Sequence, residues 1–168
     1  MQNRYRLAAS FMLVTSAVIS PAQATETTQH DNARDQLQIT DLADRATRTD
    51  LSDYFTGRAL VNPLFTAEDD SNTTAAEVIF EPAARTNWHV HPVGQQLVIT
   101  QGIGRVQIEG RPARRMRAGD VVWIPAGVRH WHGASPDHSM THIAIQERRD
   151  GQNVEWGDAV SEAQYNAE

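Results

Sequence analysis

The hydrophobic residues of this chain fall into short runs separated by Gly and Pro. Several runs alternate between apolar and polar residues, a period typical of strands with one face toward a core. The pattern predicts strands at 58–65, 75–80, 88–91, 95–101, 105–109, 111–117, 121–124, 130–133 and 140–147. Turns are expected at 92–94 and 102–104. Pro63 favours an edge position for the first strand, because proline donates no ladder hydrogen bond.

Many short strands with Gly and Pro turns are typical of an all-β sandwich or barrel. A length of 168 residues allows one domain, which we place at 51–168. A short closing helix is expected at 158–166. Residues 25–50 are polar with little periodicity, which predicts a flexible N-terminal arm with one or two helical turns around 39–46.

The first 24 residues have the pattern of a secretory signal peptide. Arg4 and Arg6 precede a mostly apolar stretch at 7–19, and Ala22 to Ala24 form a small-residue cleavage site. The apolar stretch is shorter than the roughly 20 residues that a membrane-spanning helix needs. We therefore expect cleavage after Ala24, export to the periplasm or secretion, and no membrane attachment afterwards.

Composition excludes several kinds of chemistry. The chain has no cysteine, and all 15 basic residues are arginine. Disulfides, thiolate nucleophiles and Cys-based metal sites are therefore excluded, as are Schiff-base and P-loop lysines. The net charge of −6 becomes −8 without Arg4 and Arg6, so no nucleic-acid partner is expected. Four arginines gather at 111–117, where a solvated strand edge or a subunit contact is expected, and we predict a homo-oligomer.

Two histidines, His89 and His91, are two residues apart in an extended stretch. Side chains at i and i+2 of a strand share a face, so the two imidazoles could bind one metal ion together. Gln95 falls on the same face if the chain stays extended, which makes it a candidate third ligand. An exposed His-Val-His strand that binds no metal is the alternative.

A second stretch combines turns, a strand and the alternating sequence His130-Trp131-His132. The two stretches together resemble the two signature motifs of the cupin family. The matching positions are His89, His91, Gln95 in place of Glu, Gly102, Gly119, Pro125, Gly127 and His130, while Ala134 replaces a frequent Asn. The resemblance implies a double-stranded β-helix, or jelly roll, that holds one metal at His89, His91, Gln95 and His130.

The last strand places Met140, His142, Ala144 and Gln146 on one face. One face of each strand in a small barrel points inward, and the resemblance implies that His142 and Gln146 face the cavity. A lone histidine on a strand is often structural, so both interpretations of His142 stay open. His132 shares a face with His130, and we expect it to support the site with a smaller role than His142.

Glutamine in place of glutamate changes the charge at the expected metal. Three neutral imidazoles and a neutral amide leave the charge of a divalent ion uncompensated, which favours anions such as cyanide or an alkoxide. The same field should lower the pKa of His142 and keep it neutral as a base. The ligand set does not fix the metal, because imidazoles bind several transition metals.

A narrower resemblance covers nearly all of 53–166, where the chain looks like the bacterial manganese-containing cupin hydroxynitrile lyases of the (R)-mandelonitrile lyase type. It is carried by Asp53–Gly57, Asn62–Phe65, Phe80–Pro92, Gly119–Trp123, His130–Ala134 and Met140–Glu147. It implies one divalent metal, Mn with Fe or Zn as alternatives, His142 as base, Gln146 beside it, and Ala76 and Val78 lining the cavity. A small cyanohydrin would be the substrate. A cupin dioxygenase or isomerase and a non-catalytic small-molecule-binding cupin are the alternatives.

Overall fold

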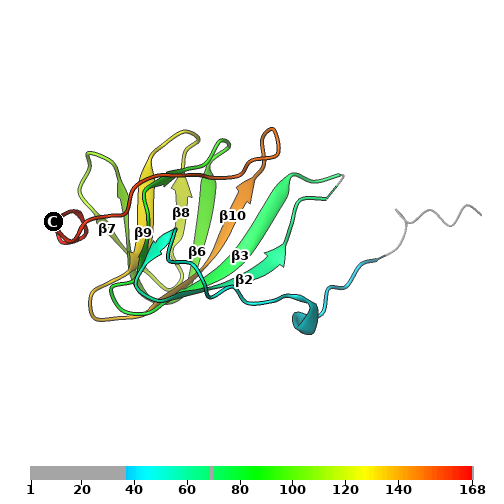
Figure 1. The fold of residues 1–168 in the computed structure, drawn as a ribbon, viewed down its shortest axis with the longest axis horizontal. Coiled ribbons are helices and arrows are strands. Elements are labelled where there is room, and N and C mark those ends of the chain that lie inside the picture. Colours follow the sequence, from blue (N-terminus) through cyan, green and yellow to red (C-terminus); the bar gives the residue numbers. More distant parts are fainter. Residues whose placement is uncertain (1–36, 69, 168) are drawn as a thin grey trace, which may run out of the picture. The chain divides into compact units, whose positions relative to one another are not determined.

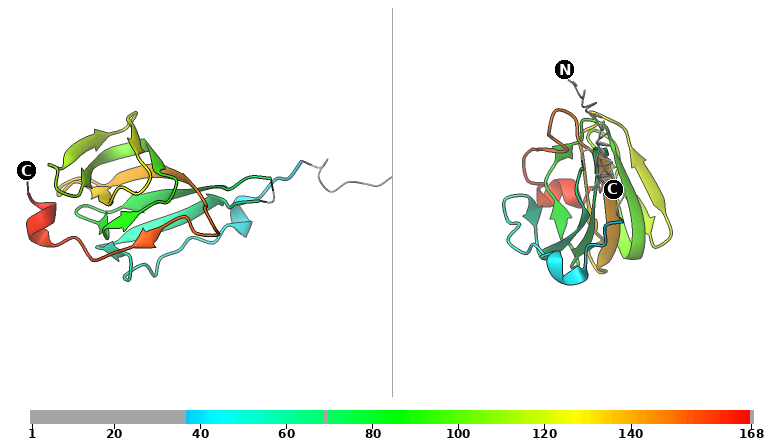
Figure 2. Two further views of the ribbon diagram at one scale, coloured as in Figure 1. Left: turned by 90° about the horizontal axis from the view of Figure 1, so that it is seen from above. Right: turned by 90° about the vertical axis from the view of Figure 1, so that its right-hand side faces the viewer.

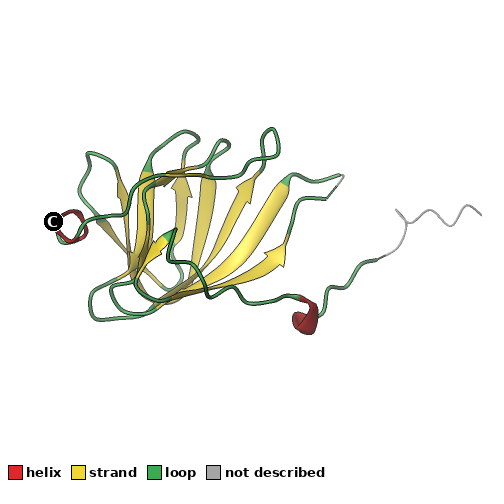
Figure 3. Cartoon of the chain, viewed as in Figure 1, coloured by secondary structure: helices red, strands yellow, loops and turns green. Residues whose placement is uncertain are grey.

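The computed structural model describes residues 37–68 and 70–167. The signal peptide predicted at 1–24 therefore lies outside the described residues. The predicted all-β fold is confirmed (Figures 1 and 3). The strands are β1 (Phe55–Thr56), β2 (Ala59–Phe65), β3 (Thr73–Phe80), β4 (Arg85–Thr86), β5 (His89–Val90), β6 (Gln95–Ile108), β7 (Arg114–Arg117), β8 (Val121–Ile124), β9 (His130–Ala134), β10 (Met140–Glu147) and β11 (Glu155–Trp156). The helices are the 3-10 turn η2 (Leu42–Asp44) and α1 (Glu162–Tyr165).

The strands form the jelly roll that was expected. The main order is β1-β4-β9-β6-β10-β3-β2, with β7 and β8 also paired to β6, and β5 paired to β9 and β11. The first half of β6 pairs with β8 and β10, and its second half pairs with β7 and β9. Because β6 belongs to both halves, the sheet folds over and encloses one interior (Figure 2).

Our prediction of two strands, at 95–101 and 105–109, with a turn between them was wrong. The chain runs through as the single strand β6, because β10 and β9 continue the ladder past the glycines, pairing with Gly102 and Gly104. Gly102 has φ of 74°, and a Cβ atom there would lie 2.0 Å from the carbonyl oxygen of Ser139. The glycine therefore bends one strand where a turn was expected.

The edge position predicted for the Pro63 strand is confirmed, since β2 ends the main strand order. The chain before β1 runs along this edge. Arg48 forms an isolated antiparallel bridge with Val61, and the guanidinium of Arg45 donates to the carbonyl of Pro63 at 3.2 Å. The last residues of the predicted arm thus contact the barrel.

The core lies between the two halves of the sheet and contains, among others, Phe80, Leu97, Ile99, Ile124 and Met140, all nearly or fully buried. A second cluster of Trp88, Trp131, Val160 and Tyr165 holds the C-terminal segment against the barrel. No helix in the described ranges is long and apolar enough to cross a bilayer.

The predicted closing helix is present but shorter than expected, at Glu162–Tyr165. The carbonyls of Asp158 and Val160 accept hydrogen bonds from Trp88 and Arg85, which keeps the preceding residues extended. Ser161 then begins the helix through a capping box with Gln164.

Candidate metal centre

A cavity of about 300 Å³ lies between the two halves of the sheet. Most of the predicted site residues line it: His89, His91, Gln95, His132, Ala76, Val78 and Gln146. The other two, His130 and His142, have no exposed surface. Aromatic side chains of Tyr54, Phe55 and Trp156 complete much of the wall, so the cavity combines an apolar lining with a cluster of imidazoles.

Strand pairing brings the imidazoles together from distant parts of the chain. His89 on β5 is directly opposite His130 on β9, and their ring centroids are 4.2 Å apart. His132 follows on the same face of β9. The nitrogens of His89, His130 and His132 lie within 4.8 Å of one another. These three form the tightest group, whereas the sequence pointed to His91 as the third imidazole.

His91 lies beside this group, with its ring centroid 5.1 Å from that of His89. Its Nε2 atom is buried and has no hydrogen-bond partner among the described groups. A buried polar atom without a partner is unfavourable unless something binds it. The predicted ligand set of His89, His91, Gln95 and His130 stays a prediction, with His132 as a further candidate.

Backbone carbonyls orient the three predicted histidine ligands. Nδ1 of His89 lies 2.9 Å from the carbonyl oxygen of Asn87, and Nδ1 of His130 lies 2.8 Å from that of Val128. Nδ1 of His91 contacts the carbonyl of Asn153 in the same way. Since a carbonyl only accepts, each Nδ1 carries the ring proton, and each Nε2 keeps a free lone pair for a metal.

The electrostatic environment keeps these rings neutral. Burial lowers the pKa of His91 and that of His130 to about 4. The pKa of His89 is also well below 6.5, through burial and then through the neighbouring imidazoles. Neutral imidazoles are the form that binds a metal ion.

A chain of side-chain hydrogen bonds orients Gln95. The hydroxyl of Thr74 donates to the backbone carbonyl of Gln146 at 3.1 Å, so its oxygen accepts from Nε2 of Gln146 at 2.9 Å. Oε1 of Gln146 then faces Gln95 and accepts from its Nε2 at 3.2 Å. The remaining atom of the amide, Oε1 of Gln95, points at Nε2 of His130.

This arrangement places two acceptors 3.2 Å apart, Oε1 of Gln95 and the unprotonated Nε2 of His130. Two facing lone pairs repel unless a cation lies between or beside them. The donor set of imidazole nitrogens and one amide oxygen therefore fits a divalent transition metal.

His132 and His142 form a separate pair. Nε2 of His142 lies 3.1 Å from Nδ1 of His132, and the other nitrogen of each ring has no partner among the described residues. Burial lowers the pKa of His142 to about 3. The pKa of His132 is also well below 6.5, through burial and then through His142. We expected the metal's field to keep His142 neutral, and burial alone already does so.

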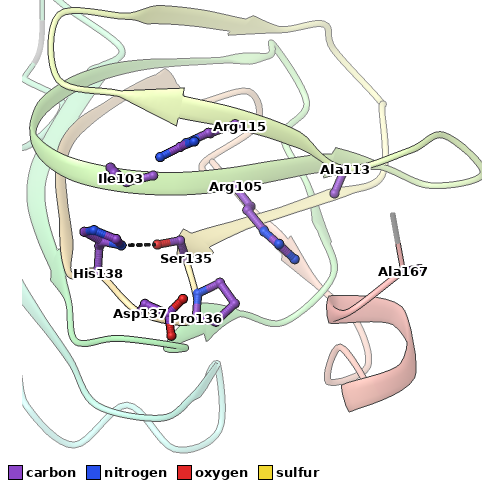
Figure 4. Close-up of a pocket in the computed structure, with 9 residues that line it drawn as sticks. All are labelled: Ile103, Arg105, Ala113, Arg115, Ser135, Pro136, Asp137, His138 and Ala167. Atoms are coloured by element: carbon purple, nitrogen blue, oxygen red, sulfur yellow. Dashed lines mark hydrogen bonds between the residues drawn. The ribbon is translucent and has the colours of Figure 1, made fainter.

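A second pocket, of about 380 Å³, lies over β6 and β7 (Figure 4). It is lined by Arg105, Arg115, Ser135 and His138, among others, and His138 is the one imidazole that the described part of the chain contributes to it. It contains none of the predicted site residues. The candidate metal centre therefore lies in the first cavity.

Sequence reasoning missed several groups around the cavity. Thr74 lies two residues before Ala76 on β3, so the same strand parity could have identified it. Asn153 lies in an irregular C-terminal stretch and Trp156 in the two-residue strand β11, and neither position carries a sequence signal. Arg48, which also lines the cavity, was assigned to a flexible arm.

Comparison with known proteins identifies the family. The model of the Cupin domain matches residues 76–145. The chain is 46% identical over 129 residues to the (R)-mandelonitrile lyase of Granulicella tundricola, which covers 77% of this chain and 98% of that protein. The chain belongs to the cupin family.

Solved structures agree with this cupin's fold. A cupin-like protein from Thermotoga maritima is 45% identical and superposes with a TM-score of 0.68, covering 75% of this chain and 95% of that one. A cupin-2 domain from Rhodospirillum rubrum superposes with a TM-score of 0.58 at 17% identity, covering 77% and 83% of the two chains. The second comparison supports the fold alone.

Proposed function

We propose that this cupin is a metal-dependent hydroxynitrile lyase, which cleaves a cyanohydrin to an aldehyde and hydrogen cyanide or runs the reaction in reverse. The observation that carries the proposal is the convergence of imidazoles and Gln95 on one cavity, in a chain 46% identical to a protein named (R)-mandelonitrile lyase. Neutral ligands suit this chemistry, because they leave the ion's charge available to an anion.

The residues that would hold the ion are His89, His91, Gln95 and His130, with His132 adjacent. A bound divalent metal, which we propose to be Mn with Fe or Zn as alternatives, would supply a Lewis acid that stabilises negative charge on cyanide. The aromatic wall of Tyr54, Phe55 and Trp156 suits an aryl group on the substrate.

The proton would be handled by the His132–His142 pair. We assign the cyanohydrin hydroxyl proton to Nε2 of His132, which lines the cavity, as the Nδ1 proton passes to Nε2 of His142. His142 is then the residue that ends with the additional proton. As the bond between the carbinol carbon and the nitrile carbon breaks, the hydroxyl oxygen becomes the aldehyde carbonyl oxygen. The electron pair of the broken bond leaves with cyanide.

Gln146 would hold the carbonyl oxygen. Its Nε2 atom uses one hydrogen on Thr74 at 2.9 Å, so the other N–H is available to a ligand in the cavity. When cyanide takes the proton back from the histidine pair, both imidazoles return to neutral and hydrogen cyanide is released.

The test is mandelonitrile cleavage together with metal analysis of the purified protein. Loss of a general base typically costs about 10²–10⁴-fold in rate, so His142→Ala should lose that much with normal metal content. His132→Ala should also lose activity, because it connects the substrate to His142. His138→Ala, in the other pocket, is the matched control and should keep full activity.

A metal-loaded wild-type protein without cyanohydrin turnover would refute the lyase assignment. Oxygen consumption by the iron-loaded form would support a dioxygenase in its place. Full activity of His142→Ala would remove the proposed proton route while leaving the metal centre intact.

A further inference from the structure

Among the described residues, one charged side chain lines the candidate metal cavity. Its lining consists of aliphatic, aromatic, imidazole, amide and hydroxyl side chains, together with Arg48. Within 37–68 and 70–167, no carboxylate lines the cavity to neutralise it. A lone positive group on the wall of an otherwise neutral cavity is a specificity feature that the lyase chemistry described above does not use.

Strand register fixes the direction of Arg48. Its backbone exchanges both hydrogen bonds with Val61, at 2.8 and 3.0 Å. Val61 is directly opposite Val78, which is directly opposite His142. Directly paired residues of a sheet point their side chains to the same face. Arg48 therefore shares the inward face with Val78 and His142, at the outer end of that row.

The preceding residue confirms this direction. Thr47 must point the opposite way, and its hydroxyl donates to Oδ1 of Asn62 at 2.7 Å. Asn62 in turn donates to Glu77 at 2.9 Å. This polar group occupies the outer face of the sheet, so the carboxylate of Glu77, on the neighbouring row, is engaged away from the cavity.

The guanidinium of Arg48 makes no hydrogen bond or ion pair with the other described residues. Arg48 is exposed, whereas the histidines that line the cavity are buried, so Arg48 lies at the open side of the cavity. A guanidinium binds a carboxylate through two parallel hydrogen bonds. The pocket therefore suits a ligand with a small apolar core and an anionic group at the end that faces Arg48.

We propose that Arg48 makes this cupin selective for substrates with a carboxylate at the end remote from the reacting carbon. An aryl aldehyde or cyanohydrin with a ring carboxylate has that chemistry. The proposal rests on the proposed function for the reacting group, but binding can be measured without turnover. A net charge of −6 would otherwise disfavour an anion, so a local positive group is needed to accept one.

The experiment is calorimetric titration of the metal-loaded protein with 4-formylbenzoate and with its neutral methyl ester. Arg48→Gln should weaken the binding of 4-formylbenzoate by about two- to fivefold, the upper range for an exposed ion pair, and leave the binding of the ester unchanged. Arg48→Lys should retain part of the preference for 4-formylbenzoate over its methyl ester. Arg114→Gln, an exposed arginine on β7, removes the same charge elsewhere and should change neither ligand.

Equal affinity of wild type and Arg48→Gln for 4-formylbenzoate would overturn the proposal, and so would an equal loss with Arg114→Gln. A carboxylate that binds the metal directly would give the first of these results. Failure of the lyase assignment is seen separately, as absent cleavage of neutral mandelonitrile. Because Arg48 contacts β2 through its backbone, its substitution should leave the melting temperature unchanged.

Discussion

The metal-free protein should lose stability steeply as the pH falls below 6.5. Five histidines are buried with pKa values below their ordinary 6.5: His89, His91, His130, His132 and His142. Burial is the first cause for each. In the unfolded chain all five would protonate near pH 6.5. Between pH 6.5 and the folded-state pKa, the unfolded state binds more protons than the folded state. The free energy of unfolding therefore decreases as the pH is lowered through this range.

The magnitude follows from proton linkage. Each histidine that is neutral when folded and protonated when unfolded contributes about 1.4 kcal/mol of stability per pH unit. Five together give about 7 kcal/mol per pH unit once the pH is below about 5.5. The loss levels off only below the folded-state pKa, about 4 for His91 and His130 and about 3 for His142. Since domains are typically stable by about 5–15 kcal/mol, the metal-free protein should unfold near pH 5.

The assay is urea unfolding of the metal-free protein at pH 7.5, 6.5 and 5.5, followed by tryptophan fluorescence. Trp156 lies 4.8 Å from the ring of His89 and reports on the site. A double variant, His132→Asn with His142→Asn, should reduce the slope by two-fifths. A metal at about a thousand times its dissociation constant adds about 4 kcal/mol and should lower the unfolding pH by about half a unit.

An unfolding free energy that stays constant within about 1 kcal/mol between pH 7.5 and 5.5 would refute the reasoning, since buried neutral histidines cannot avoid this linkage. An unchanged slope in the double variant would show that the other three histidines, or carboxylates, dominate. If the metal raised the free energy of unfolding by the same amount at every pH, the metal would be bound by groups other than imidazoles.

Four further predictions follow from individual contacts. His130→Ala should release most bound metal and lower the melting temperature, measured by metal analysis and calorimetry. Gln95→Glu should keep the metal but slow mandelonitrile cleavage about tenfold or more, because a negative ligand weakens the hold on cyanide; unchanged turnover would exclude ligand charge as the cause. Thr74→Val should weaken metal affinity about 10–100-fold by freeing the Gln amides, read by competition with a chelator. Gly102→Ala should destabilise by about 3 kcal/mol or more, whereas Gly110→Ala, where a Cβ meets nothing within 4 Å, should cost about 1 kcal/mol.

The sequence predicted the strands and the faces of the site residues because both depend on local periodicity. The strand at 140–147 matches β10, and its alternation correctly puts Met140 and Ala144 in the interior. The spacing of His89 and His91 and that of His130 and His132 brought four imidazoles to one region. Periodicity failed at 102–104, because a glycine with positive φ can reverse a chain or merely bend it. Neighbouring strands decide between these outcomes.

The contacts that give the site its chemistry depend on which strands are neighbours, and a local pattern does not contain that information. Parity placed His132 and His142 on inward faces, but the 3.1 Å contact between their nitrogens requires β9 and β10 to face one another across the interior. Gln95 could be named as a candidate ligand from its spacing. The direction of its amide oxygen is set by Gln146, which is 51 residues away, and by Thr74, on a third strand. The identity of the candidate ligands can thus be read from the sequence. Their protonation and orientation, which determine what they could bind, are properties of the assembled barrel.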